Sequence, residues 1–542
     1  MLMPLKSDLF QFLGRESPAE VKRLIGLSIF VGIVNTAIIG MINACAKLVT
    51  DGESITLEFF FFAFLLIFFL FLAKHANEVN IRSTQDLIYR FKIRIMRDVF
   101  KSNLTRIDSI GRGYITEVMM RDTQMVSQSV STLVTTFQAV ATLFFLTLYL
   151  ATVSMTAFFI ISLASILIFV VGVREMFKVN TKLQEVAVME AEVNSLYADF
   201  LNGFKEIQIN DARAWDMTHD MMTQSTVVNE QKSRHIIDIT NFFNYMQVIL
   251  YVVVGIIVFV VPVISPTFSE YVTTSATTAL FLAGCLAGLI TSIPSLSQAN
   301  VSAKALQDLA EKLEIKGPEM EVRRTEHFED ISSIELSNVS YRHAGADPKK
   351  RFVLGPISCK FEAGNIYFIR GANGSGKTTL IRILTGLYQP MDGEILVNGM
   401  PVSVPASTDY RNIFSAVFSD FFLFKKLYGI HNPDPATIRE LISTFRMEGK
   451  VDIVNGVFSD LNFSTGQRKR IALIVALLEQ KQIMILDEWA ADQDPEFRQE
   501  FYEHIIPRLR AMGKTVIAIT HDDHYYNVAD HVLYLADGKL SK

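Results

Sequence analysis

The first half of the chain alternates long apolar runs with two long polar segments. Six runs approach or exceed the roughly 20 residues that a helix needs to cross a bilayer. The third and fourth of these runs are separated only by a short turn around Ser154. The pattern predicts an all-α membrane domain over residues 1–300 with six spanning helices, near 24–46, 55–75, 131–154, 156–176, 242–264 and 274–298.

The polar segments after the second and fourth runs are rich in basic residues. Residues 74–121 contain ten Lys and Arg, and residues 174–234 contain seven. Because basic loops are retained in the cytoplasm, these segments and both termini are predicted to be cytoplasmic. Helical spacing of their apolar positions predicts that the spanning helices continue into the cytoplasm and turn near Gly113–Arg121 and Ile209–Trp215. Solvated helical loops are the alternative.

The second half of the chain has the pattern of an α/β domain. Residues 301–332 change from a charged helical pattern to a polar stretch, which indicates a linker. From residue 333 to residue 542, short β-rich apolar runs alternate with helical patterns. The expected fold is therefore a six-helix membrane domain followed by an α/β P-loop NTPase domain.

A glycine-rich loop with the spacing of a phosphate-binding loop follows one of these strand patterns. Residues 371–378 match G-x-x-x-x-G-K-[ST]. Glycines allow backbone N–H groups to turn toward phosphates, and the following helix directs its positive N-terminus at them. Lys377 is expected to contact the β- and γ-phosphates, and the Thr378 hydroxyl to ligate Mg²⁺. The residues expected to bind nucleotide here are Gly371, Ala372, Asn373, Gly374, Ser375, Gly376, Lys377, Thr378 and Thr379.

Two further strand patterns end in residues suited to catalysis. The run at 483–487 ends in Asp487, which can hold Mg²⁺ through its water shell, followed by Glu488, which can polarise or orient the attacking water. The run at 515–519 leads to His521, at the carboxyl end of a strand where α/β folds place ligands. A lone histidine is more often structural, but this context favours a catalytic role beside Glu488 and Lys377.

A second phosphate-binding surface is expected at Ser464–Gln467. Ser464 is a good N-cap for the helix that follows. The turn at Thr465 and Gly466 exposes backbone N–H groups at the positive end of that helix.

Composition agrees with a membrane protein. The chain is 50% hydrophobic and contains 41 Phe among 542 residues, which is more apolar than a soluble protein of this length. The net charge is −5 and there is no basic patch, so nucleic acid is not an expected partner. Cys45, Cys285 and Cys359 have the spacing of neither a disulfide framework nor a metal site.

The order of these motifs resembles the ATP-binding cassette (ABC) transporters over essentially the whole chain. Ser464–Gln467 is similar to the family's signature motif, with Thr465 in place of its first glycine. Asp494 falls at the D-loop aspartate and His521 at the switch histidine. The two cytoplasmic turns resemble coupling helices, and a membrane domain that precedes the cassette resembles exporters. The resemblance implies ATP and Mg²⁺ as cofactors and ATP hydrolysis as the activity.

The run Asp487–Pro495, Asp-Glu-Trp-Ala-Ala-Asp-Gln-Asp-Pro, looks like that of exporters of cyclic peptides and siderophore precursors. This branch includes transporters of microcins, pyoverdine precursors and lipopeptides in the bacterial inner membrane. The implied cargo is a peptide-derived or amphiphilic small molecule. A lipid or multidrug exporter is an alternative, and an ATP-gated channel or membrane regulator is an alternative of another class.

The resemblance also implies a partner, and two positions depart from the family pattern. Each family ATP site joins the P-loop of one cassette to the signature of another, so a second copy of the chain is expected. The glutamine that contacts Mg²⁺ is replaced by Ser419, with Asp420 beside it, and both are expected near the metal. Either His343 or Tyr341 is expected to stack on adenine, with a core role as the alternative for Tyr341.

Overall fold

The computed structural model describes residues 8–50, 52, 54–264, 271–313, 328, 330–342, 352–402 and 408–541. The chain divides into two compact units, and each is described by itself. We call Met1–Phe100 with Ile110–Glu314 the helical unit, and Lys101–Ser109 with Ile315–Lys542 the α/β unit.

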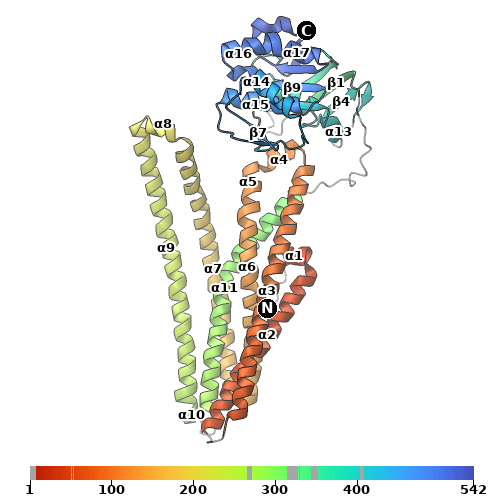
Figure 1. The fold of residues 1–542 in the computed structure, drawn as a ribbon. Helices are drawn as coiled ribbons and strands as arrows, with labels where there is room; N and C mark the ends of the chain where they lie inside the picture. Colours follow the sequence, from red (N-terminus) through yellow and green to blue (C-terminus); the bar gives the residue numbers. More distant parts are fainter. Residues whose placement is uncertain are drawn as a thin grey trace. The chain divides into compact units, whose positions relative to one another are not determined.

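The helical unit consists of long helices (Figure 1). Six of the described helical segments are long and apolar enough to cross a membrane, which confirms the predicted number of spans. The predicted break at Ser154 is also present, because its side chain caps the next helix by accepting from the Ala157 N–H at 3.4 Å. The elements are α1 Asp8–Glu16, α2 Pro18–Thr50, α3 Thr56–Lys101, α5 Arg112–Glu117, η2 Val118–Asp122, α6 Thr123–Val153, α7 Met155–Asn202, α8 Phe204–Gln208, α9 Asp211–Gly255, η3 Ile256–Val260, α10 Val261–Ile264 and α11 Val272–Leu313.

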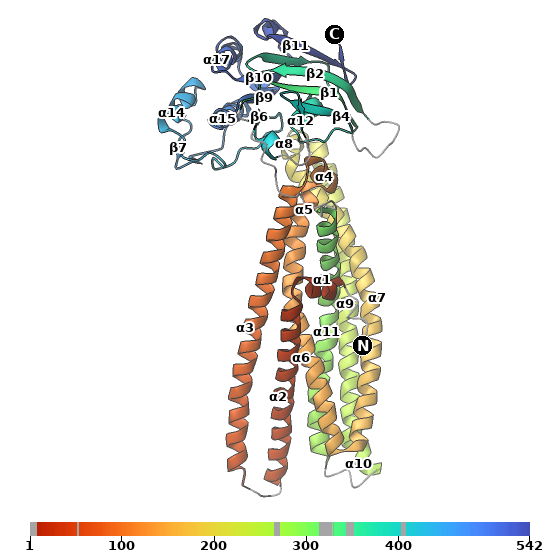
Figure 2. The ribbon, with the colours of Figure 1, turned by 90° about the vertical axis from the view of Figure 1, so that its right-hand side faces the viewer.

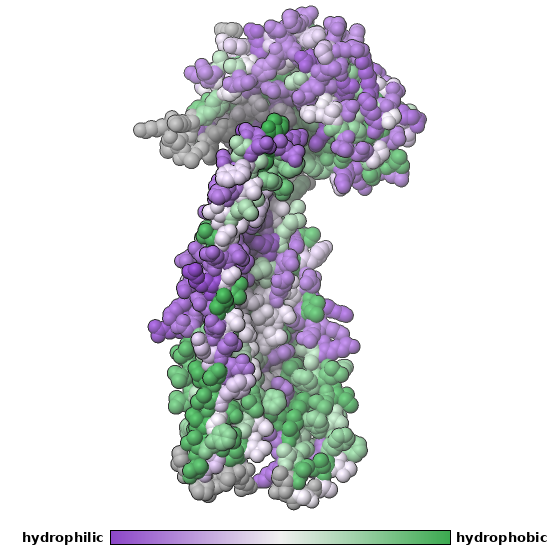
Figure 3. Space-filling model, turned by 90° about the vertical axis from the view of Figure 1, so that its left-hand side faces the viewer, coloured by the Kyte–Doolittle hydropathy of each residue, from purple (hydrophilic) through white to green (hydrophobic). Residues whose placement is uncertain are grey.

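Hydrophobic side chains gather over one end of these helices and polar side chains over the rest of their length (Figure 3). The apolar end of α3 exposes Phe59, Phe60 and Phe64, each by more than half of its surface. Exposed aromatic side chains in such a run face lipid in a membrane protein. In the polar part of these helices, α1 is held to α3 by the Arg94–Glu16 ion pair at 2.6 Å and by the packing of Phe12 on Phe91.

Both turns that were predicted between long helices lie earlier in the chain than their sequence patterns indicated. After α3 the chain turns back between Lys101 and Arg112, around the short helix α4, Leu104–Ile110, whereas Gly113–Arg121 is helical. Asn103 caps α4 by accepting from the Arg106 N–H at 3.0 Å, and Gly111 ends it with φ at 90°. After α7 the chain turns back between Asn202 and Asp211, around α8, so that most of the predicted Ile209–Trp215 turn lies in α9.

The α/β unit contains two main sheets (Figure 2). The antiparallel sheet has the order β2-β1-β4-β5, formed by Val353–Glu362, Ser333–Arg342, Asp392–Val397 and Met400–Pro401. The other has the order β12-β11-β3-β10-β9-β6, formed by Lys539–Ser541, His531–Ala536, Ile366–Arg370, Thr515–Ile519, Ile483–Asp487 and Phe414–Val417. All its neighbouring strands are parallel except the β11–β12 pair.

Helices and short elements surround these sheets. They are α12 Lys377–Leu384, α13 Thr408–Arg411, α14 Pro435–Thr444, the β7–β8 hairpin (Ile453–Val454 and Val457–Phe458), α15 Thr465–Leu478, η6 Trp489–Asp492, α16 Pro495–Glu500, η7 Phe501–Ile505, α17 Ile506–Ala511 and η8 Asp523–Val528. Strands β9 and β10 are buried along their whole length, as expected for parallel strands covered on both faces. The carboxyl ends of β3, β6, β9 and β10 meet at one edge, which brings four separated segments together.

Candidate functional site

The phosphate loop leaves the end of β3 and enters α12. Its conformation requires glycine at two positions. A Cβ on Gly371 would lie 2.2 Å from the Leu535 carbonyl oxygen. Gly376 has φ at 102°, and its Cβ would lie 2.7 Å from Leu354 Cδ1. The loop therefore keeps its backbone close to its neighbours and leads directly into the N-terminus of α12, the end of a helix that favours an anion.

Lys377 is 6% exposed, and its ammonium lies inside this loop. Its Nζ donates to the carbonyl oxygens of Gly371 at 2.9 Å and Ala372 at 3.1 Å. A cation held against a loop of backbone N–H groups is the arrangement that binds the phosphates of a nucleotide. Residues Gly371–Thr379 thus fit ATP.

The candidate metal ligands surround the end of β9. Asp487 is buried, and its Oδ2 accepts from Ser419 Oγ at 3.1 Å and from Ser419 N at 3.4 Å. Its Oδ1 has no hydrogen-bond partner among the residues that the structure describes. Burial raises the pKa of Asp487, and hydrogen bonds from Ser419 and the Thr378 side chain oppose that shift. A buried carboxylate oxygen with a free lone pair beside two hydroxyls fits Mg²⁺, which prefers oxygen ligands.

Asp420 faces a different partner. Its Oδ2 accepts from Arg382 Nη2 at 3.2 Å, and its side chain is 59% exposed. Of the two residues that stand in place of the family's glutamine, Ser419 is therefore the one in contact with Asp487.

Glu488 and His521 lie beside each other at the ends of β9 and β10. Glu488 has φ at 50°, which turns its side chain out of the strand, and its N–H donates to the Ile519 carbonyl at 3.1 Å. Glu488 Oε1 lies 3.3 Å from His521 Nε2. The buried ammonium of Lys469 donates to the Glu488 carbonyl at 2.6 Å and pairs with Asp492 at 2.7 Å. This arrangement holds the carboxylate where it can orient water.

The two candidates for adenine stacking have different outcomes. Tyr341 is 7% exposed, and its ring stacks on Tyr388 at a centroid distance of 5.1 Å. This geometry favours the core interpretation of Tyr341. His343 lies outside the described residues.

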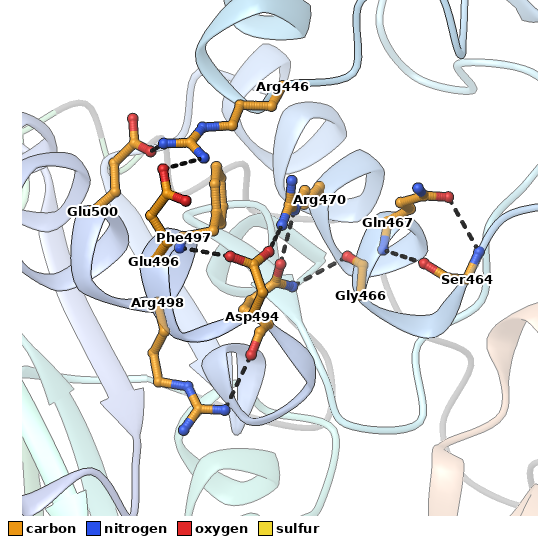
Figure 4. A network of polar contacts seen from close by, with 11 residues as sticks. Arg446, Ser464, Gly466, Gln467, Arg470, Asp494, Glu496, Phe497, Arg498 and Glu500 are labelled. Carbon is orange, nitrogen blue, oxygen red and sulfur yellow. Dashed lines mark hydrogen bonds and ion pairs between the residues drawn. The ribbon is translucent and has the colours of Figure 1, made fainter.

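The signature residues form the start of α15 (Figure 4). Ser464 and Gln467 make a capping box, in which Gln467 N donates to Ser464 Oγ at 3.4 Å and Ser464 N to Gln467 Oε1 at 3.3 Å. The sequence context predicted the N-cap correctly. A Cβ on Gly466 would lie 2.5 Å from the Asp492 carbonyl oxygen, so that the turn packs directly on the segment after Glu488.

Arg470 connects this helix to Asp494 (Figure 4). Its guanidinium donates to Gln493 Oε1 at 2.8 Å and to Asp494 Oδ2 at 2.6 Å, and lies 3.7 Å above the Phe497 ring. Gln493 in turn donates to the Gly466 carbonyl at 3.1 Å. The backbone N–H of Phe497 and the charge of Arg470 lower the pKa of Asp494, which stays ionised and caps α16.

Sequence reasoning did not single out Lys469, Arg470 or Gln493. The available signal was that Lys469 and Arg470 belong to a run of three basic residues at the start of a helical pattern that is apolar from Ile471 to Leu478. Such residues are buried only with oxygen partners, and the run from Glu488 to Asp494 supplies them.

Comparison with known proteins identifies the family. Residues 354–491 match the family described as ABC transporter. The chain is 30% identical over 525 residues to the ATP-binding protein SyrD of Pseudomonas syringae pv. syringae, covering 94% of this chain and 91% of that protein. The chain belongs to the ABC transporters.

Other relatives match this ABC transporter over part or all of its length. The subtilin transport ATP-binding protein SpaT of Bacillus subtilis is 28% identical over 270 residues, covering 46% of this chain and 42% of SpaT. The structure of a bacterial Atm1-family ABC exporter with ATP bound superposes with a TM-score of 0.75 at 17% identity, over 97% of this chain and 96% of the other. The fold is therefore that of an Atm1-type exporter.

These findings define what the transporter does at the level of its family. Its α/β unit binds and hydrolyses ATP, and hydrolysis drives export. One membrane domain and one ATP-binding domain make a half-transporter, which implies a dimer.

Proposed function

We propose that two copies of this chain export a peptide-derived product, such as a cyclic peptide, a lipopeptide or a siderophore precursor, across the bacterial inner membrane. The observation that carries the cargo class is the run Asp487–Pro495, which resembles that of exporters of such products. The match with SyrD over 94% of the chain supports extending this resemblance to the membrane half. In this proposal both termini and the α/β unit are cytoplasmic.

The residues assigned to ATP binding fall into two separate segments of the chain, which supports the pairing of two identical copies. One chain supplies one phosphate loop and one signature. Lys377 contacts its own loop, whereas the Gly466 carbonyl accepts from Gln493 and the Gly466 backbone packs closely on the Asp492 carbonyl. We infer that each ATP lies between Gly371–Thr379 of one copy and Ser464–Gln467 of the other, with Asp494 beside it.

Each of the residues at this site has a separate role in the proposed hydrolysis of ATP. Lys377 neutralises charge on the β- and γ-phosphates, and Glu488 orients the attacking water while His521 Nε2 holds its Oε1 in place. Thr378, Ser419 and Asp487 would hold Mg²⁺, which supplies charge stabilisation on the same phosphates when bound. ATP favours the closed state because it binds that state more tightly, and loss of the γ-phosphate removes the contacts.

The cargo class is tested with the full chain in nanodiscs. We expect a cyclic peptide or lipopeptide to raise the ATPase rate of the parent and to have no effect on Glu488→Gln. Arg508→Ala is the matched control, because the Arg508–Glu440 ion pair is exposed and lies outside the site.

Other outcomes favour the alternatives. Stimulation by phospholipid or by a cationic drug alone supports a lipid or multidrug exporter. ATP-dependent ion conductance that persists in Glu488→Gln supports a gated channel.

A further inference from the structure

Arg498 lies on α16 and contacts the segment that follows Glu488. Its Nη2 donates to the carbonyl oxygens of Ala491 and Gln493, each at 3.1 Å (Figure 4). Both carbonyls belong to the η6 turn and its C-terminal end, which lead away from Glu488. One planar guanidinium therefore fixes the end of this turn at two points.

The same guanidinium reaches the segment that follows His521. Its Nη1 forms an ion pair with Asp522 Oδ1 at 3.5 Å, and the Asp522 side chain is 23% exposed. Glu488 follows β9 and His521 follows β10. Arg498 therefore bridges the two segments that carry the proposed catalytic pair.

Tyr502 holds Asp522 at its other carboxylate oxygen. The Tyr502 hydroxyl donates to Asp522 Oδ2 at 2.9 Å and lies 2.6 Å from Thr520 Oγ1. Burial raises the pKa of Tyr502, so the hydroxyl keeps the single proton that it donates to Asp522. Thr520 must then donate to the Tyr502 oxygen, while its own oxygen accepts from the Asp522 N–H at 3.0 Å. Asp522 is thus held at both carboxylate oxygens and at its backbone N–H.

The Tyr502 ring is itself fixed by packing. It is 1% exposed, stacks on Tyr525 at a centroid distance of 4.5 Å and meets the edge of Phe368 at 5.9 Å. Phe368 belongs to β3, the strand that precedes the phosphate loop. Through this ring, Asp522 is attached to the hydrophobic core of the α/β unit.

Stability alone does not explain these contacts. Ion pairs that are only partly buried contribute little to stability, and buried ones often do no better than apolar packing. The Nε of Arg498 is buried and has no hydrogen-bond partner among the residues that the structure describes, which is a cost. What the contacts do provide is a fixed position of Asp522 relative to Ala491 and Gln493.

We propose that Arg498 is a positioning residue for ATP hydrolysis, which sets the contact between Glu488 and His521 by joining the segments that follow them. The separation that it controls is the 3.3 Å between Glu488 Oε1 and His521 Nε2. Tyr502 supports Arg498 by holding Asp522 in place. This inference rests on the proposed roles of Glu488 and His521 and on no particular cargo.

The test is steady-state ATPase activity of the full chain in nanodiscs, with binding of a fluorescent ATP analogue measured on the same samples. Arg498→Ala should lower kcat about 10–100-fold, the effect of a displacement of about 1 Å at the reacting groups. The KM for MgATP should change by less than about threefold. Arg498→Lys keeps the charge but not the planar fork, and should recover only part of the lost kcat.

Tyr502→Phe removes the hydroxyl alone and should lower kcat about 3–10-fold, the effect of one hydrogen bond. The matched control is Tyr525→Phe, which should keep the parental kcat. Tyr525 stacks on the same ring, and its hydroxyl makes no hydrogen bond within the described part of the chain. In a His521→Ala background, Tyr502→Phe should lower kcat by less than about twofold further, because it acts through His521. A purely structural role of Tyr502 would give the same factor in both backgrounds.

Three results would overturn the inference. They are a parental kcat in both Arg498→Ala and Tyr502→Phe, a raised KM with unchanged kcat in Arg498→Ala, and equal effects of Tyr502→Phe with and without His521. If Arg498→Ala no longer binds the ATP analogue, the comparison of Tyr502→Phe with Tyr525→Phe decides instead. Parental turnover in His521→Ala would overturn the proposed role of His521 as well, so the two failures can be told apart.

Discussion

Replacing Lys469 by Met should misplace the Glu488 carboxylate, to which we assign the orientation of the attacking water, and leave the phosphate loop in place. Methionine has a similar volume, so the packing of the stem is retained. The Glu488 carbonyl loses its donor, which costs about 1–3 kcal/mol for a buried acceptor. The variant also loses the Lys469–Asp492 ion pair. Asp492 is 44% exposed, so water compensates for most of this pair, which contributes at most about 1 kcal/mol.

The expected loss of stability is about 3 kcal/mol, or roughly 6–12 °C in Tm for a domain of this size. A shift of Glu488 by about 1 Å should lower kcat about 10–100-fold. The KM for MgATP should change by less than about threefold, because the polar contacts that the structure describes for Lys469 join it to Glu488, Asp492 and Trp489 and not to Gly371–Thr378.

The assay is steady-state ATPase activity of the full chain in nanodiscs, with unfolding followed by tryptophan fluorescence. Trp489 is 1% exposed and donates to the Lys469 carbonyl, so it reports on this region directly. Trp215 is the other tryptophan of the chain and is removed in a Trp215→Phe background. Parental kcat and Tm in Lys469→Met would refute the assigned role, and Arg508→Ala serves as control.

Three further predictions concern the metal and signature residues. Ser419→Ala should raise the Mg²⁺ concentration needed for half-maximal ATPase activity about 10-fold, since it removes the hydroxyl that orients Asp487. Asp420→Ala should raise this concentration less, and equal effects of the two variants would contradict the assignment. Gly466→Ala forces a contact with the Asp492 carbonyl and should cost about 1–3 kcal/mol, with ATPase lost but binding of a fluorescent ATP analogue retained. The pKa of Asp487 is higher in the folded than in the unfolded state, so the folded state loses stability as the pH rises from the unfolded-state pKa through the folded-state pKa. The Tm of the nucleotide-free parent should therefore fall relative to Asp487→Asn over that range, and parallel pH profiles would contradict this.

The sequence predicted the features that are set by contiguous residues. A helix that spans lipid must satisfy its own backbone and stay apolar for about 20 residues, so all six spans could be predicted from local pattern. The phosphate loop, the carboxylates after β9 and the cap at Ser464 are also local, because each is made by neighbours in the chain.

Features that depend on distant packing could not be predicted in the same way. The first turn required a choice among several glycines, and Gly111 rather than Gly113 has the positive φ. The Tyr341–Tyr388 stack joins two elements far apart in sequence, and so does the contact of Lys469 with the Glu488 carbonyl. The partners of Ser419 and Asp420 differ although the two residues are adjacent, because the loop after β6 directs one side chain to β9 and the other to α12.

The central claim is that Glu488 drives hydrolysis in an ATP site that powers transport. The most direct measurement compares ATP turnover and ATP binding in the parent and in Glu488→Gln, in the same nanodiscs. The claim predicts that turnover falls by about 10²–10⁴-fold while binding of ATP is retained. Turnover within a few-fold of the parent would contradict it.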